Sequence, residues 1–76
     1  MIQEHDSVVL LADLPNAGLE AGDVVVVVHV HPGGRAFEVE FMTLGGETVA
    51  VETLEADRLR PAKPREILHV RNLPAA

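Results

Sequence analysis

The sequence predicts an all-β fold, a small and strongly bent antiparallel sheet, and three observations carry this prediction. Residues 22–42 hold a valine run, a Pro-Gly-Gly turn and a strict alternation of apolar and acidic residues, which is the pattern of a β-hairpin. The 76 residues suffice for one domain with a thin core. The chain has no cysteine, so it must rely on a very apolar core or on association rather than on disulfides.

The N-terminal part of the chain predicts one strand and one folded loop. Residues 7–12, Ser-Val-Val-Leu-Leu-Ala, form an apolar run of strand length. Residues 13–23 are expected to form a loop, because the Pro-Asn-Ala-Gly sequence at 15–18 favours turns. We expect Leu14 and Leu19 to fold this loop back against the core.

Strand two is expected over residues 24–31, and strict alternation divides its side chains between two faces. The core face would hold Val24, Val26, Val28 and Val30, and the opposite face would hold Val25, Val27, His29 and His31. A half-buried strand alternates apolar and polar residues, whereas the first half of this strand is apolar on both faces. We therefore expect Val25 and Val27 to be covered by the C-terminal segment or by a neighbouring subunit.

Strand three is expected over residues 36–42. Glu38 and Glu40 would point outward, opposite to the inward residues Phe37, Val39 and Phe41. Paired carboxylates can perform acid–base chemistry, but alternation alone explains this pair, and neither a nucleophile nor an apolar pocket accompanies it. We therefore expect no catalytic site and no enzymatic activity.

The remaining elements complete a short series. A glycine turn at 44–47 leads to a fourth strand over 48–53, a single 3-10 turn over 54–57, and a closing strand over 58–61 that ends at proline. Five short strands with a 3-10 turn before the last one predict a small SH3-like barrel, whose closure would remove exposed sheet edges. The predicted core is Val8, Leu10, Val24, Val26, Val28, Phe37, Val39, Phe41, Val49, Val51 and Leu59.

The predicted domain organisation is a barrel over residues 1–63 and a C-terminal arm over residues 64–76. Residues 65–71, Arg-Glu-Ile-Leu-His-Val-Arg, contain enough apolar side chains to pack against the barrel and enough β-branched residues to pair with a strand. They are expected to form either a sixth strand or a docking arm. Residues 72–76 are expected to be frayed.

Short segments of the chain carry a resemblance to a known family, namely Asp6–Leu10, Asp13–Pro15 with Gly18-Leu19, Gly22–Val24, Val27–Val30, Phe37–Phe41, Thr48–Val51 and Leu54. With these segments the chain resembles the bacterial domain-of-unknown-function family 4926 over residues 4–61. The resemblance implies an SH3-like barrel and brings no catalytic residues, because the shared motifs concern shape rather than chemistry. This chain has Val25-Val26 where the family usually has a small or polar pair. The surface of strand two is therefore more hydrophobic here, which favours an interface at this strand.

Charge and composition exclude several classes of partner. The net charge is −6, which disfavours general nucleic-acid binding. Two Phe with no Tyr or Trp cannot build the aromatic surfaces that bind single strands or proline-rich peptides. Residues 1–57 hold eleven carboxylates and one basic residue, whereas residues 58–76 hold five basic residues and one carboxylate. The basic end is expected either to be solvated or to lie on the acidic barrel, its own or a neighbour's.

The cellular compartment is expected to be the cytoplasm. Residues 1–6, Met-Ile-Gln-Glu-His-Asp, contain neither a basic region nor an apolar signal core. The valine run is too short to span a bilayer, so no membrane association is expected.

His29 and His31 are weak candidates for a metal site. Two imidazoles at positions i and i+2 lie on one face of a strand, which is a spacing that some zinc enzymes use. A third ligand would have to come from His69, His5 or a glutamate. The alternative is that both rings are partly exposed and hydrogen-bonded to carboxylates or water. We expect no cofactor and no tightly bound zinc.

The sequence favours a non-catalytic protein–protein interaction module that neutralises or regulates a partner protein encoded nearby. The partner is expected to be another protein or a second copy, with a dimer favoured. The alternative is a nucleic-acid- or ribosome-associated SH3-like barrel, which rests on fold analogy and on the basic tail. The predicted interaction residues are Val25, Val27, His29, His31, Arg65, Ile67, Leu68 and Val70.

Overall fold

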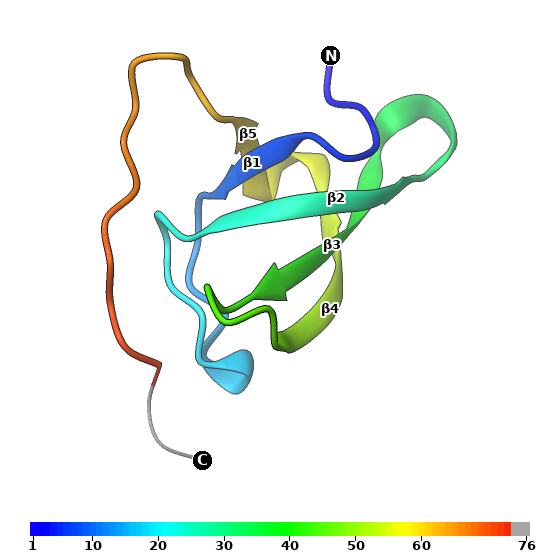
Figure 1. Cartoon of the computed structure of the whole chain (residues 1–76). Helices are drawn as coiled ribbons and strands as arrows, with labels where there is room; N and C mark the ends of the chain where they lie inside the picture. Colours follow the sequence, from blue (N-terminus) through cyan, green and yellow to red (C-terminus); the bar gives the residue numbers. More distant parts are fainter. Residues whose placement is uncertain (74–76) are drawn as a thin grey trace.

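The computed structural model describes residues 1–73 and shows one antiparallel sheet with the strand order β4-β3-β2-β1-β5 (Figure 1). This confirms the predicted all-β class. No helix in the described residues is long and apolar enough to cross a membrane. The strands are β1 (Ser7–Leu10), β2 (Val24–Val30), β3 (Ala36–Met42), β4 (Thr48–Glu55) and β5 (Leu59–Pro61), and the 3-10 turns are η1 (Pro15–Ala17), η2 (Pro32–Gly34) and η3 (Ala56–Arg58).

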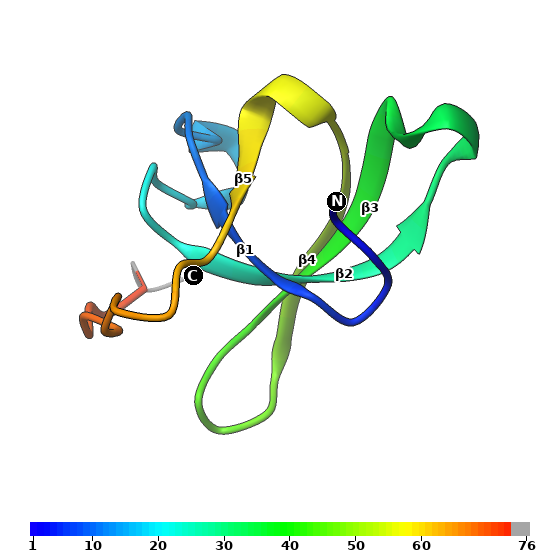
Figure 2. The same cartoon turned by 90° about the horizontal axis from the view of Figure 1, so that it is seen from above.

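The sheet curls on itself as a small SH3-like barrel (Figure 2). The 3-10 turn η3 links β4 to β5, as the sequence predicts for the turn before the last strand. Strand pairing does not complete the circle within residues 1–73, because β4 and β5 are the two edges of the ladder. The expected closure of the barrel by hydrogen bonds is therefore wrong for this part of the chain.

The core is built from large apolar side chains of all five strands. Six of the predicted core residues are buried, namely Val8, Leu10, Phe37, Val39, Phe41 and Leu59. The loop between β1 and β2 folds back as expected, because Leu14 and Leu19 form an isolated β-bridge and Leu19 is buried. Gly18 ends η1 with a φ of 72°, a left-handed conformation that glycine adopts without strain.

The predicted faces of β2 are reversed over its first half, residues 24–28, whereas Val30 packs against the core as predicted. Val25 and Val27 are 1% and 0% exposed, whereas Val24 and Val28 are 39% and 38% exposed. Val24 and Val28 therefore do not belong to the core, Val26 is only half-buried, and Val25 and Val27 do not form an outer face.

A β-bulge explains this reversal. Val27 lies opposite Val39 and His29 lies opposite Glu38, so two steps along β2 match one step along β3, with Val28 as the extra residue. Without a bulge, strict alternation would place Val25, Val27 and His29 on the same face. The bulge shifts the alternation by one residue, so both valines can point inward while His29 points outward.

A similar error affects β4. Val51 lies opposite Glu40 and is exposed, while Val49 is half-buried against the core. The strand extends beyond Thr53, and Leu54 is buried opposite Phe37. Because burying Leu54 selects the face of the strand that points inward, Val51 points to solvent.

Residues 62–73 form an arm that contains no strand in the described part of the chain. The arm runs along the outside of the barrel beside β1 and the start of β2, in orange and red in Figure 1. Of the two predicted forms, a sixth strand and a docking arm, the structure has the arm. Residues 74–76, which belong to the segment expected to be frayed, lie outside the described residues.

Candidate interaction surface

The arm is attached to the barrel at its beginning through Glu66. Arg60 of β5 donates through Nη1 to Oε1 of Glu66 at 2.8 Å and through Nη2 to Oε2, forming a two-pronged ion pair. The backbone N–H of Lys63 also donates to Oε1 at 2.7 Å. The hydrogen bonds from Arg60 and Lys63 lower the pKa of Glu66 to about 2. This first anchor fixes the direction in which the arm leaves β5.

The arm is attached a second time through Arg71. Its Nε donates to Oδ1 of Asp23 at 2.9 Å, and its Nη2 donates to Oδ2 of Asp23 and to the carbonyl oxygen of Gly18 at 3.2 Å. Glu20 lies 3.6 Å from Nη1. Burial raises the pKa of Asp23, but the Arg71 hydrogen bond, the Glu20 amide and the Arg71 charge outweigh it and lower that pKa. The second anchor thus joins the arm to the acidic loop before β2.

The apolar side chains between the two anchors are not packed. Ile67, Leu68 and Val70 are 93%, 70% and 73% exposed. The arm therefore lies on the barrel through its charged residues, not through its apolar ones. This is unusual, because apolar side chains of an ordered segment ordinarily supply the burial that keeps it in place.

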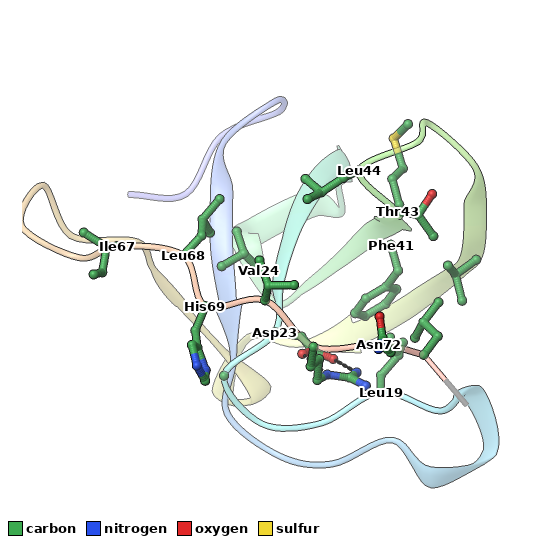
Figure 3. Close-up of a pocket in the computed structure, with 16 residues that line it drawn as sticks. Leu19, Asp23, Val24, Phe41, Thr43, Leu44, Ile67, Leu68, His69 and Asn72 are labelled. Carbon is green, nitrogen blue, oxygen red and sulfur yellow. Dashed lines mark hydrogen bonds and ion pairs between the residues drawn. The ribbon is translucent and has the colours of Figure 1, made fainter. Parts of the chain in front are cut away.

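A groove lies between the arm and the barrel (Figure 3). It encloses a cavity of about 580 Å³ that is open to solvent. Met42, at the end of β3, is 50% exposed, and Leu44, in the turn after it, is 90% exposed; both line the groove. We call the arm surface the set of exposed apolar residues on both sides of the groove, which comprises Val24, Met42, Leu44, Ile67, Leu68, Val70 and Leu73.

The predicted interaction residues are distributed over three places. Val25 and Val27 belong to the core, so their assignment to an interface is wrong. The arm residues Arg65, Ile67, Leu68 and Val70 are exposed. His29 and His31 lie together at the opposite end of β2, where their ring centroids are 5.1 Å apart and Glu38 is the nearest carboxylate to His31.

Sequence reasoning missed the barrel side of the arm surface and both anchors. Val24 was placed in the core because the bulge in β2 leaves no signal in a continuous valine run. Leu44, a large apolar residue beside two glycines in a hairpin turn, is the one signal that the sequence did offer, since such a residue is expected to be exposed. The charge asymmetry offered contact between the basic end and the acidic barrel as one of two alternatives, without naming the residues, and Arg71 makes such a contact with Asp23.

Comparison with known proteins gives a family but no activity. The model of the family described as Domain of unknown function (DUF4926) matches residues 4–61, from the segment before β1 to the last residue of β5. The chain belongs to this family. No curated protein and no solved structure matches significantly. The family match includes Asp23 and Arg60, while the arm with Glu66 and Arg71 lies beyond it.

The first anchor is expected to weaken in acid. A carboxyl group with a depressed pKa contributes stability that is present above its ordinary pKa, about 4.5, and is lost as the pH falls towards its folded value of about 2. A titration of the side-chain carboxyl signals by nuclear magnetic resonance should give a midpoint for Glu66 near 2, with the backbone signals of the arm changing in the same range. A midpoint near 4.5 would show that Arg60 does not hold Glu66 in solution.

Proposed function

We propose that this DUF4926 protein is a non-catalytic protein-interaction module whose contact site is the arm surface. The observation that carries the proposal is the exposure of Ile67, Leu68 and Val70 in a segment that is anchored on both sides by ion pairs. Contiguous exposed apolar surface usually marks a contact site. The ionic anchors hold these side chains in place, so a partner would lose less conformational freedom of the arm on binding.

The occupant we propose is a second copy of the chain. In a symmetric dimer, the apolar arm residues of each copy would cover Val24, Met42 and Leu44 of the other. The charges are complementary, since the segment 58–76 is basic and the segment 1–57 is strongly acidic. Such exposed charge pairs add little affinity but favour one register and speed the encounter. A different partner protein, which this chain would neutralise or regulate, would bind to the same surface.

The same contacts count against the nucleic-acid alternative. Arg60 and Arg71 are paired with Glu66 and Asp23, so two of the five basic residues of the C-terminal segment are already neutralised. Nucleic-acid binding depends on basic residues that are free to neutralise phosphates. The arm surface supports a protein contact instead.

The test is the oligomeric state of the full chain and of a triple variant, Ile67→Ser, Leu68→Ser and Val70→Ser. Light scattering over a range of concentrations is expected to show a dimer for the full chain and a monomer for the triple variant, because the variant removes the apolar side of the interface without touching the anchors. The matched control is the double variant Leu11→Ser and Val51→Ser, which changes exposed apolar residues outside the groove. The control should remain dimeric. A full chain that is monomeric throughout, or a triple variant that still dimerises, would overturn the proposed occupant.

A further inference from the structure

The outer face of the β2–β3 hairpin gathers two histidines and one carboxylate. The bulge in β2 turns His29 outward, directly opposite Glu38 of β3, and His31 follows two residues later beside the same glutamate. One ligand atom from each of the three residues lies within 4.8 Å of the others. No other group of three or more such side chains with this spacing occurs in residues 1–73.

The second observation concerns the environment of Nε2 of His31. This nitrogen is shielded from solvent and has no hydrogen-bond partner in the described residues. Oε2 of Glu38 is 3.6 Å away, which is too far for a hydrogen bond. Two ligands that each bind zinc at 2.0–2.1 Å in a tetrahedral site lie about 3.3 Å apart. The separation of these two atoms is therefore close to the distance that a shared metal ion requires.

We propose that His29, His31 and Glu38 form a weak, exchangeable binding site for a divalent zinc ion. Two imidazoles and one carboxylate are a donor set that proteins use for zinc. The ion has no geometric preference from its d electrons, so it tolerates a site on a twisted hairpin. A fourth position would face solvent, because His29 is exposed and the other two side chains are half-buried.

The site is weak for a structural reason. Nε2 of His31 has no hydrogen-bond partner in the described residues, so no hydrogen bond through this atom fixes the orientation of the ring. The rings now meet edge to face, and the exposed ring of His29 is free to turn its nitrogen towards that of His31. The proposal agrees with the expectation that the chain holds no tightly bound zinc.

The test is a calorimetric titration of the metal-stripped full chain with zinc chloride. We expect saturable binding of one ion per chain, in the micromolar range. His29→Ala and His31→Ala should each weaken binding at least about tenfold, and Glu38→Gln, which keeps the shape but removes the charge, should weaken it several-fold. His5→Ala and His69→Ala are the matched controls and should bind as the unmodified chain does.

A second measurement does not depend on any variant. Cobalt(II) added to the unmodified chain should give the intense visible absorption of a tetrahedral site, and excess zinc should remove it. Circular dichroism checks that each variant is folded. Binding that survives in His29→Ala and His31→Ala, binding that is lost equally in His69→Ala, or no saturable binding up to about 1 mM zinc would overturn the proposal.

Discussion

Replacing Phe41 by alanine is expected to destabilise the chain by about 3–5 kcal/mol. Phe41 is 3% exposed at the centre of the core and lies opposite Ala50 in the β3–β4 ladder. The chain has two phenylalanines and no tryptophan or tyrosine, so few large side chains are present to fill the cavity. A domain of this size has a free energy of unfolding of about 4–11 kcal/mol. The substitution therefore removes a large part of the stability of the domain.

The measurement is urea unfolding, read as the shift of the midpoint at unchanged slope. Val51→Ala is the matched control, since it truncates a residue of the neighbouring strand β4 that is 55% exposed and lies outside the groove. The free energy of unfolding of that variant should fall by less than about 1 kcal/mol. If Phe41→Ala and Val51→Ala unfold at similar urea concentrations, Phe41 does not point into the core.

Replacing Val27 by aspartate is expected to unfold the chain. Val27 is fully buried, and its backbone also joins the N-terminal segment to β2, because its N–H donates to Asp6 and its carbonyl accepts from His5. An unpaired charge at this position costs about 4–5 kcal/mol or more, since no basic group is available in the apolar core. Circular dichroism should show the loss of the sheet.

Val28→Asp is the paired variant and decides where the bulge lies. Val28 is the extra residue of the bulge and is partly exposed, so a charge there can remain in water. This variant should stay folded at a urea midpoint close to that of the unmodified chain. The opposite pattern, with Val28→Asp unfolded and Val27→Asp folded, would mean that β2 alternates regularly and that the faces are those expected from the sequence.

Local pattern was sufficient for the class of fold and for the order of its elements. The alternation of residues 36–42, the glycine-bearing turns and the proline that ends the last strand each depend on neighbours in the chain. For the same reason, the inward residues of β3 and the folded loop around Leu14 and Leu19 were predicted correctly. The contrast between the acidic and basic ends left two alternatives, a solvated basic end and a basic end that lies on the acidic barrel, and the contact of Arg71 with Asp23 agrees with the second.

Tertiary structure alone decided the faces of β2 and β4. Five consecutive valines present the same side chain to either face, so local sequence carries no signal for the residue at which the alternation shifts. Pairing with β3 decides it, because Glu38 and Val39 must lie on opposite faces and their partners follow them. The same pairing brings Glu38 to the two histidines, which the spacing of His29 and His31 could not specify.

The arm was also decided by contacts between residues far apart in the chain. The composition of residues 65–71 is compatible with a strand, but the free edges of the sheet are on β4 and β5, whereas the arm lies beside β1, which is paired on both sides. The arm lies instead where Arg71 reaches Asp23, a residue 48 positions away. Its apolar side chains are left exposed because the inward-facing residues of the five strands already fill the core.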